Sequence, residues 1–512
     1  MNYRYLLSFF IALLFLDSCK ETQQKEHQKH PNIIYILADD LGYGELGCYG
    51  QKKIETPSID KLAEEGMRFT QHYAGAPVCA PSRCVLLTGK HLGHAQIRGN
   101  DEWKERGDVW DYRATIADST LEGQRPIKEN TITIGRLLQK AGYKTAIVGK
   151  WGLGAPHTAG VPNKQGFDYF FGYNCQRQAH TYYPVHLWEN MHRIYLNNDT
   201  VLPHTKLAEN ADPYDPTSYK SFHLNDYAPD LMFNRITQFI NENKKQAFFL
   251  YWATPIPHVP LQAPDKWIKY YHQKFGDEEP YTGKFGYFPN RYPHATYAAM
   301  ISYLDENIGK LIQQLKDLGI YDNTIIIFSS DNGPSYAGGA DPTWFNSGGI
   351  FRSEYGRGKG FVYEGGIRVP MIVCRKGVVQ AGSISNHISS FYDVLPTLCD
   401  IAEIKQPEGI DGISFLPELK GEEQKEHDFL YWEFPEYGGQ IAVRLGKYKA
   451  VCRNMRKEEN FNFELYDLEK DSTESDNIAE EYPEIIEKVK EIIKKQHIKS
   501  NNPRWQFKVL GD

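Results

Sequence analysis

The 512-residue sequence predicts an α/β fold with a mostly parallel central sheet flanked by helices, followed by a smaller C-terminal α+β part. Two observations predict this fold. Short apolar, β-rich runs end in polar residues, and helical patterns lie between those runs. Continuous apolar runs are typical of strands that are buried on both faces of a sheet. Ligands bind beyond the carboxyl ends of such strands, so the polar residues found there are candidates for a functional site.

Four apolar runs carry the predicted central strands, at residues 33–37, 144–148, 248–252 and 324–328. Each run is followed by polar side chains, and in chain order these are Asp39 and Asp40, then Lys150, then His258, then Asp331 and Asn332. Helical patterns over 134–141 and 300–315 end near Gly142 and Gly319, as glycine C-caps predict. The predicted topology therefore brings four groups of polar residues to one edge of the sheet.

From about residue 421 the pattern changes to short strands at 429–432, 440–445, 448–452 and 463–466, followed by a helix over 483–497. The helix carries charged residues on one face and Ile485, Ile486, Val489 and Ile492 on the other. We therefore predict a large domain over residues 31–420 and a small subdomain over 421–512.

The N-terminus predicts export. An apolar run over residues 5–16 follows Arg4 and is too short to span a membrane, which is typical of a secretion signal over 1–18. Leu16-Asp17-Ser18-Cys19 resembles a bacterial lipobox, which would lipidate Cys19. Residues 19–30 are polar and predict a tether. We expect a periplasmic or outer-membrane-anchored lipoprotein; an ordinary signal peptide cut nearby is the alternative.

Composition excludes one class of partner. The chain has 58 Lys and Arg against 65 Asp and Glu, a formal net charge of −7, so it is not a basic nucleic-acid-binding protein.

The two acidic pairs after the first and fourth strands suggest a metal site. Asp39, Asp40 and Asp331 offer carboxylates and Asn332 an amide oxygen, which are the hard ligands that Ca²⁺ and Mg²⁺ prefer. The alternative is that both pairs only form turns, because Asp, Asn and Gly favour strand ends.

The segment around Cys79 predicts a helix that begins near this cysteine. Pro81 suits a first turn and Gly89 a helix end. Cys79 then lies at a helix N-terminus, where free N–H groups favour an anion, and Arg83 lies one turn further on. A lone cysteine is more often a small buried apolar residue, and only the complete pattern argues against that reading.

Cys79-x-Pro81-Ser82-Arg83 followed by Leu86-Leu87-Thr88-Gly89 resembles the signature of the formylglycine-dependent type I sulfatases, members of the alkaline-phosphatase-like superfamily. The resemblance extends from about residue 31 to 415, through the acidic pairs, Gly149-Lys150-Trp151, His258 and Lys359-Gly360. The C-terminal part resembles the small antiparallel-sheet subdomain of sulfatases.

In that family the motif cysteine is oxidised to Cα-formylglycine, the aldehyde is hydrated, and one hydroxyl of the diol attacks sulfur. The resemblance implies a divalent metal, Ca²⁺ or alternatively Mg²⁺. It implies that the metal ligands are Asp39, Asp40, Asp331, Asn332 and the modified Cys79. It implies further that Arg83 and Lys150 steady the formylglycine hydroxyls, that Lys359 and His258 contact the sulfate, and that His258 is the general acid. A formylglycine-generating or radical maturation enzyme would be needed as a partner.

One position departs from the family pattern. Many members have a histidine two residues after the lysine of the Gly-Lys-Trp motif, whereas Gly152 stands here. His180, in a Tyr-Tyr-Pro-containing stretch, and His157 are candidates to replace it, with His180 favoured.

The substrate is predicted only in outline. His94, Arg98 and Asn100 follow the cysteine helix closely and are candidates to line a sugar subsite, as is His157. We expect a sulfatase acting on sulfated oligosaccharides or polysaccharides, on galactose or N-acetylgalactosamine 4-O- or 6-O-sulfate. The alternatives are a phosphoryl or phosphonate ester hydrolase of the same superfamily and a surface lipoprotein that binds sulfated glycans without turnover.

Overall fold

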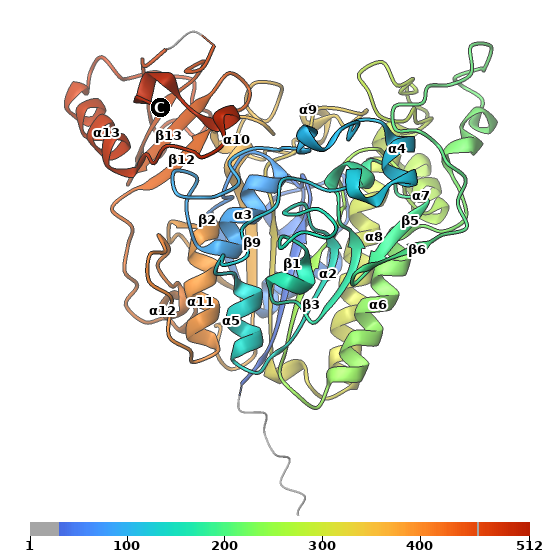
Figure 1. Ribbon diagram of the computed structural model, residues 1–512, viewed down its shortest axis with the longest axis horizontal. Helices are drawn as coiled ribbons and strands as arrows, with labels where there is room; N and C mark the ends of the chain where they lie inside the picture. The colour runs from blue at the N-terminus through green and yellow to red at the C-terminus, as the bar shows by residue number, and fades with distance from the viewer. Residues whose placement is uncertain (1–29, 458–459) are drawn as a thin grey trace, which may run out of the picture.

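A computed structural model describes residues 30–457 and 460–512, and its central feature is an 11-stranded mixed sheet (Figure 1). The four predicted strands are neighbours at its centre, in the order β8-β1-β7-β3, and all of their pairings are parallel. Their bounds are Asn32–Ala38 for β1, Lys144–Lys150 for β3, Phe248–Ala253 for β7 and Thr324–Ser330 for β8. The prediction of a mostly parallel central sheet is confirmed.

The outer strands make the sheet mixed. Antiparallel pairings join β8 to β9, β9 to β2, β4 to β5 and β5 to β6. The outer strands are β2 (Met67–Tyr73), β4 (Tyr169–Tyr173), β5 (His186–Glu189), β6 (His192–Tyr195), β9 (Arg368–Cys374), β10 (Ser383–Ser385) and β11 (Ser389–Ser390).

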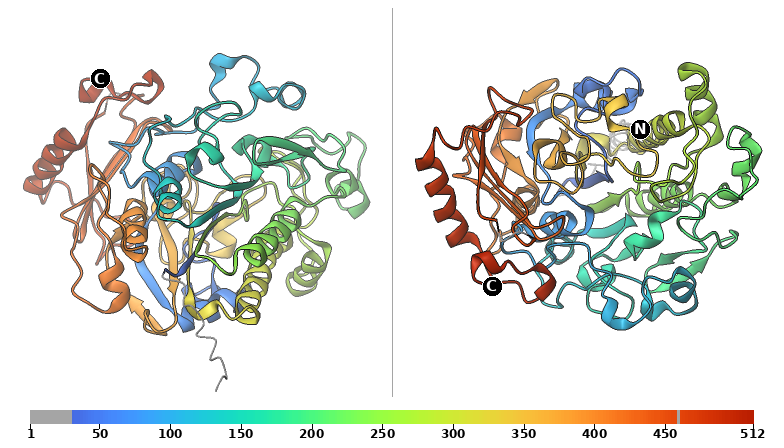
Figure 2. Two further views of the ribbon diagram at one scale, coloured as in Figure 1. Left: turned by 60° about the horizontal axis from the view of Figure 1, so that its bottom comes forward. Right: turned by 90° about the horizontal axis from the view of Figure 1, so that it is seen from above.

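Helices cover both faces of this sheet because its central strands are apolar on both sides (Figure 2). Along β1, Ile33 and Tyr35 join one buried cluster and Ile34 and Ile36 the other. The first face is covered by α3 (Cys79–Thr88), α5 (Ile134–Lys140) and α11 (Val394–Ile401). The second face is covered by α2 (Pro57–Glu65), α6 (Ala228–Asn243), α7 (Asp265–Phe275) and α8 (Pro293–Asp317).

Both predicted helices of this region are present, with different bounds. The helix predicted over 300–315 begins at Pro293 in α8, where proline suits the first turn because it has no N–H group that would need a partner. The remaining short helices are α4 (Tyr112–Ala117), α9 (Pro342–Phe345), α10 (Glu364–Ile367) and α12 (Leu416–Lys420).

The C-terminal part forms the predicted α+β unit. Its antiparallel sheet consists of β12 (Leu430–Phe434), β13 (Gln440–Leu445), β14 (Tyr448–Cys452) and β15 (Glu464–Asp467), in that order, and α13 (Pro483–Gln496) packs on it. Trp432 on β12 belongs to the apolar core of the large sheet, and its indole N–H donates to the Ala74 carbonyl at 2.9 Å. The division between residues 420 and 421 stays a prediction.

The predicted signal, Cys19 and most of the tether lie outside the described residues. Within 30–457 and 460–512, no helix has the length and apolar character that would let it cross a membrane.

Candidate active site

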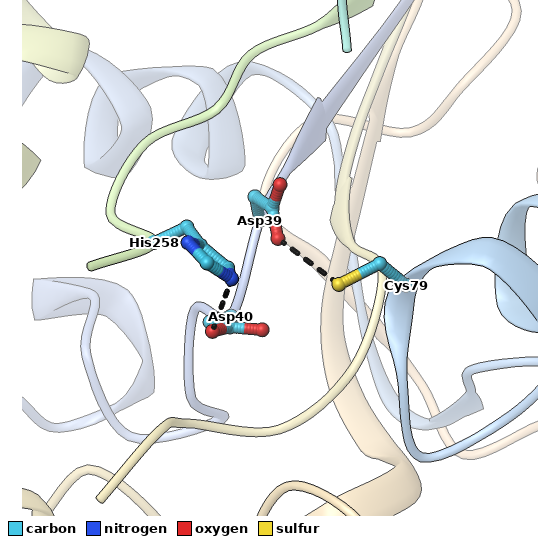
Figure 3. Close-up of side chains that lie close together, drawn as sticks. All are labelled: Asp39, Asp40, Cys79 and His258. Carbon is cyan, nitrogen blue, oxygen red and sulfur yellow. Dashed lines mark hydrogen bonds and ion pairs between the residues drawn. The ribbon is translucent and has the colours of Figure 1, made fainter. Parts of the chain in front are cut away.

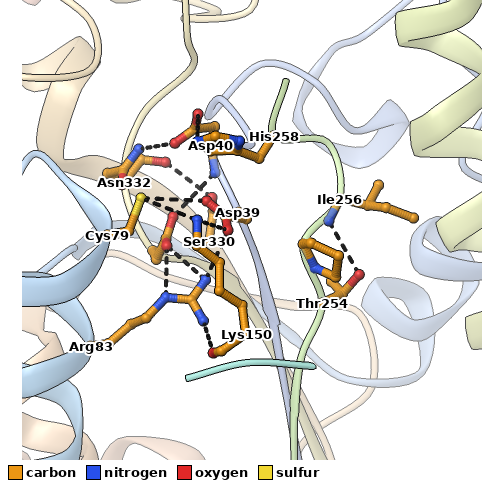
Figure 4. Close-up of polar contacts among 12 residues, drawn as sticks. Asp39, Asp40, Cys79, Arg83, Lys150, Thr254, Ile256, His258, Ser330 and Asn332 are labelled. Carbon is orange, nitrogen blue, oxygen red and sulfur yellow. Dashed lines mark hydrogen bonds and ion pairs between the residues drawn. The ribbon is translucent and has the colours of Figure 1, made fainter. Parts of the chain in front are cut away.

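The carboxyl edge of the sheet gathers polar residues from all four central strands (Figure 4). Backbone hydrogen bonds tie the segments that follow the strands together: Asp331 N donates to Ala38 O and Asp39 N donates to Ile256 O, each at 3.0 Å. These contacts bring the loop carrying His258 against the acidic pair that follows β1. The strand register therefore determines which residues meet.

Cys79 is the first residue of α3, and it is buried. Val78 before it is extended, and Gly89 after the helix has a φ of 66°, so the predicted helix start and end are confirmed. The Cys79 Sγ lies 3.6 Å from Asp39 Oδ1 (Figure 3) and 3.6 Å from Lys150 Nζ (Figure 4). The thiol therefore lies between an acid and a cation.

Arg83 binds two of the acids from one helical turn further along α3. Its guanidinium donates to Asp331 Oδ2 at 2.9 and 3.0 Å and to Asp39 Oδ2 at 3.2 Å. It also donates to the Lys150 carbonyl at 2.6 Å. Paired contacts of this kind offset the cost of burying the guanidinium and the carboxylates, because neither charge is solvated by water.

The two acids that Arg83 binds, Asp39 and Asp331, differ in pKa. Burial raises the pKa of Asp331 to about 7, and the charge of Asp39 adds to that shift. Burial also acts to raise the pKa of Asp39, but the cations Lys150 and Arg83 outweigh it and hold the Asp39 pKa below its usual range. Lys150 is the strongest of these cations, with Nζ 2.6 Å from Asp39 Oδ2.

Asp40 makes a second set of polar contacts, with Lys359, His258 and Asn332. Its Oδ2 lies 2.6 Å from Lys359 Nζ and 3.7 Å from His258 Nε2, and its Oδ1 accepts from Asn332 Nδ2 at 2.8 Å. Asp40 has a φ of 66°, a left-handed conformation that is uncommon outside glycine. Strained backbone of this type clusters at functional sites.

His258 and His180 form a stacked pair. Their ring centroids are 5.5 Å apart with 16° between the planes, and Tyr287 contacts both rings. The Val259 carbonyl lies 2.5 Å from His258 Nδ1, which leaves Nε2 directed at Asp40. Burial lowers the pKa of both imidazoles, and Lys150 and Lys359 add to the shift. His180 Nδ1 is buried without a partner.

The donor set fits a hard divalent cation. Asp39, Asp40 and Asp331 supply carboxylates within one cluster, and the buried Asn332 Oδ1 has no hydrogen-bond partner. Ligand atoms of Asp39, Asp40, Cys79 and His258 lie within 4.8 Å of one another. An unpartnered buried oxygen beside carboxylates suits Ca²⁺ or Mg²⁺ better than zinc, which prefers nitrogen and sulfur.

Gly152 leaves no room for a side chain. It has a φ of 83°, and a Cβ there would lie 2.4 Å from Gln176 Nε2. Gln176 begins the 3-10 helix Gln176–His180, which carries His180, and its Nε2 is buried without a partner. Gln176 thus fills the space beside position 152, which no feature of the sequence indicates.

The residues predicted for the sugar subsite lie in different surroundings. Asn100 Oδ1 accepts from Ala80 N at 3.2 Å, next to Cys79. Arg98 is buried and its guanidinium is held by Glu433 on β12 and by two carbonyls. His94 Nδ1 lies 2.9 Å from Asp411 Oδ1. His157 is exposed and makes no hydrogen bond or ion pair with a described site residue. Their substrate roles stay predictions.

Besides Gln176, Tyr287 and Gln440 contribute to the site without a recognisable sequence signal. Tyr287 lies in a loop after α7, and Gln440 lies on β13 of the small sheet. Gln440 Nε2 donates to Gly360 O at 2.8 Å and its Oε1 accepts from Val362 N at 3.2 Å, so it holds the backbone that directly follows Lys359. Only the packing of the two sheets brings these residues to the site.

A mostly parallel α/β sheet with acids, buried cations and a helix-start cysteine at its carboxyl edge defines an ester hydrolase of the alkaline-phosphatase-like superfamily. Residues 31–404 match the sulfatase family model, and residues 354–499 match the N-sulphoglucosamine sulphohydrolase C-terminal model. The chain belongs to the sulfatase family, and its activity is that of a sulfuric ester hydrolase.

Relatives support this assignment over most of the chain. Human N-acetylgalactosamine-6-sulfatase is 31% identical, with 82% of this chain and 71% of the relative covered. The N-acetylgalactosamine-6-O-sulfatase of Bacteroides thetaiotaomicron is 29% identical, with 96% and 98% covered. The crystal structure of Ps i-CgsB in complex with k-i-k-neocarrahexaose has a TM-score of 0.68 at 27% identity, with 91% and 93% covered.

Proposed function

We propose that this sulfatase hydrolyses sulfate monoesters on glycans, on galactose or N-acetylgalactosamine carrying 6-O- or 4-O-sulfate. The observation that carries the proposal is the position of Cys79, 3.6 Å from both Asp39 Oδ1 and Lys150 Nζ within a buried set of acids and cations. The names of the N-acetylgalactosamine-6-sulfatase relatives favour the 6-O position. The carrahexaose complex of a structural relative supports a glycan substrate.

The metal ligands proposed are Asp39, Asp40, Asp331, Asn332 and the modified residue 79, with Ca²⁺ as the ion and Mg²⁺ as the alternative. The unpartnered Asn332 Oδ1 supports this set. A bound divalent cation would offset the negative charge of the sulfate ester and of the nucleophile.

The proposed nucleophile is residue 79 after a maturation enzyme has oxidised it. Hydrated Cα-formylglycine supplies a geminal diol, one hydroxyl of which attacks sulfur. Lys150 and Arg83 are the proposed partners that orient the hydroxyls, because Lys150 Nζ contacts Sγ and Arg83 holds Asp39 and Asp331 in place. Asp331 is the proposed base towards the attacking hydroxyl, because its carboxylate belongs to the same buried cluster and is held by Arg83.

Lys359 and His258 are the proposed contacts to the sulfate oxygens. His258 Nε2 is the proposed donor of a proton to the departing sugar oxygen, because the Val259 carbonyl leaves that atom free to exchange one. In the absence of substrate, burial together with Lys150 and Lys359 keeps this imidazole neutral. A bound sulfate ester brings negative charge between these groups, which favours the protonated form. His180, stacked on His258, is the proposed replacement for the histidine missing at Gly152.

The first test combines a peptide mass spectrum across Cys79 with sulfate release. The protein is produced in a host with a maturation enzyme and offered 6-O- and 4-O-sulfated galactose and N-acetylgalactosamine. We expect an aldehyde at residue 79 and release from one of these sugars. Cys79→Ala abolishes release, whereas Cys84→Ala, a buried cysteine further along the same helix, retains it.

The outcomes separate the alternatives. Aldehyde without release from any sugar would move the search to phosphoryl or phosphonate esters. Unmodified Cys79 in a competent host, together with glycan affinity, would support a binding protein instead. Sulfate release by Cys79→Ala would overturn the mechanism.

We also propose export and anchoring through a lipidated Cys19. Membrane fractionation of cells that produce the full chain tests this, because Cys19→Ala should move the protein to the soluble fraction. An unchanged distribution would contradict the anchor.

A further inference from the structure

Four aromatic residues form a continuous cluster beside Lys359, and the catalytic proposal uses none of them. Ring centroids of Tyr336 and Tyr355 are 5.0 Å apart, those of Tyr355 and Phe361 5.6 Å, and those of Phe361 and Tyr437 5.5 Å. We refer to these four residues as the aromatic cluster. Three of them lie between residues 336 and 361, and Tyr437 comes from the distant turn between β12 and β13.

The aromatic cluster is continuous with the candidate site through the backbone. Tyr336 follows Asn332 by four residues, and Phe361 follows Lys359 by two. Tyr437 packs against Gly360, because a Cβ on Gly360 would lie 2.7 Å from its ring. A group held near Lys359 therefore has these rings as its neighbours.

Two rings of the cluster are exposed to solvent, whereas large aromatic side chains are usually buried in the protein interior. Tyr355 is 70% exposed and Tyr437 is 46% exposed, whereas Phe361 beneath them is 8% exposed. Exposed aromatic rings that form one contiguous surface mark binding sites more often than single exposed residues do.

The backbone at Tyr437 has a left-handed conformation, which is strained for a residue other than glycine. Tyr437 lies at the tip of the β12–β13 hairpin with a φ of 51°, followed by Gly438 at 91° and Gly439 at 83°. A left-handed tyrosine costs free energy that a glycine would not. Such outliers at the rim of a site are grounds for proposing a function for the residue.

We propose that the aromatic cluster is a subsite for the pyranose ring next to the sulfated sugar. This inference rests on the proposed glycan sulfatase function. The flat rings of Tyr355 and Tyr437 offer faces on which the apolar C–H face of a sugar can stack, and their hydroxyls offer hydrogen bonds to its rim. The sulfated sugar would then lie against Lys359 and its neighbour against the cluster.

The test compares two substrates on the matured enzyme: 6-sulfated N-acetylgalactosamine and a tetrasaccharide that ends in the same sulfated sugar. The quantity measured is the ratio of kcat/KM for the tetrasaccharide to kcat/KM for the monosaccharide. We expect Tyr355→Ala and Tyr437→Ala each to lower this ratio by about tenfold, mainly through the KM of the tetrasaccharide. Tyr355→Phe should keep most of the ratio, because the ring is retained.

Tyr195→Ala is the matched control, since Tyr195 is 66% exposed and lies on the edge strand β6. It should leave the ratio unchanged, and melting temperatures check that all variants fold. Equal ratios in wild type, Tyr355→Ala and Tyr437→Ala would overturn the subsite.

If the wild type releases sulfate from neither compound, the proposed function on this sugar fails instead. The subsite is then judged by calorimetric binding of the same tetrasaccharide to the same variants. Weaker binding in the two tyrosine variants supports the subsite, and unchanged binding rejects it.

Discussion

Asp331 joins the acids of the site to the cysteine helix through its two carboxylate oxygens. Oδ2 accepts from Arg83, and Oδ1 accepts from the Asp40 backbone N–H at 3.1 Å. Loss of this side chain would leave a buried guanidinium short of a partner, which costs several kcal/mol in typical cases. Replacement of Asp331 by asparagine, whose side chain has the same shape, removes the charge and disturbs the packing less.

We therefore expect Asp331→Asn to weaken Ca²⁺ binding by about tenfold or more and to lower sulfate release, because one negative ligand is lost. Calorimetric titration with Ca²⁺ measures the affinity. Asp322→Asn is the control, since Asp322 is exposed and pairs with Lys376 before the other end of β8. Equal affinity of Asp331→Asn and wild type would contradict the ligand assignment.

We expect substitution of His180 to lower kcat and substitution of His157 to leave it unchanged. His180 stacks on His258 and is buried at Nδ1, whereas His157 is exposed. His180→Leu should lower kcat by about 10²-fold and change the pH profile of kcat/KM, as removal of an acid–base partner does. His157→Leu is the matched comparison. A wild-type kcat in His180→Leu would show that His180 does not replace the histidine missing at Gly152. Gln176 would then be the next candidate for that role.

Single residues were predictable from the sequence where a motif and a strand end coincide. Asp39, Lys150, His258 and Asp331 each follow an apolar run, so their convergence could be expected. Arg98 shows the limit of this reasoning. Its position after the cysteine helix suggests substrate contact, but its partner Glu433 lies 335 residues away, and no local pattern reports such a pairing.

At the scale of elements, the four central strands were predictable because they are buried on both faces and read as unbroken apolar runs. Several outer strands were not, since β6 has only exposed and half-buried residues and β11 has only two residues. Helix α8 begins seven residues before its predicted start. In its first turns, small buried residues such as Ala295 and Ala298 face the core. The large apolar residues at helical spacing, on which the prediction rested, begin only at residue 300.

The hairpin of β12 and β13 affects the site through Gln440, whose amide contacts the backbone at Gly360 and Val362, directly after Lys359. Gln440→Leu should raise KM for the sulfate ester by about tenfold with a smaller change in kcat, because two buried backbone groups lose their partner and the lysine loses its fixed position. Steady-state kinetics measures both constants.

Gln424→Leu is the control for Gln440, because Gln424 also bonds several backbone groups but lies near α12, away from Lys359. A similar fall in melting temperature for both variants, with KM raised only in Gln440→Leu, supports positioning. KM values that match the wild type would show that the contact serves stability alone.

At the scale of the whole molecule, the two sheets share one apolar core, since Trp432 and Phe434 of the small sheet belong to the cluster that covers the large one. The family resemblance predicted both sheets, but it did not predict that they share a core. This joint packing explains how residues of the small sheet reach the site.

Buried histidines give the fold a predicted acid sensitivity. Burial lowers the pKa of His72 to about 3 and that of His91 to about 4, whereas an unfolded histidine titrates near 6.5. As the pH falls below 6.5 the unfolded chain therefore binds protons that the folded protein does not. The free energy of unfolding should fall by up to about 1.4 kcal/mol per pH unit for each histidine.

His72→Asn should make the free energy of unfolding fall less steeply between pH 6.5 and 4, because one of these protons is removed while an amide replaces Nδ1 toward Ser389. Urea denaturation at several pH values measures the slope. His192→Asn, at an exposed position, should leave the slope as in wild type. Identical slopes for all three proteins would show that His72 does not control acid stability.

Strand β1 has a further consequence for how the enzyme meets its substrate. Asn32 begins the strand at one edge of the sheet, and Asp39 and Asp40 follow it at the other, so seven residues of about 3.3 Å each separate the two by about 23 Å (Figure 1). A protein held to a cell surface through the segment before Asn32 would turn the sheet edge that carries Asp39 and Asp40 away from that surface. Long, bulky glycan chains in the surrounding medium could then dock without first approaching the lipid.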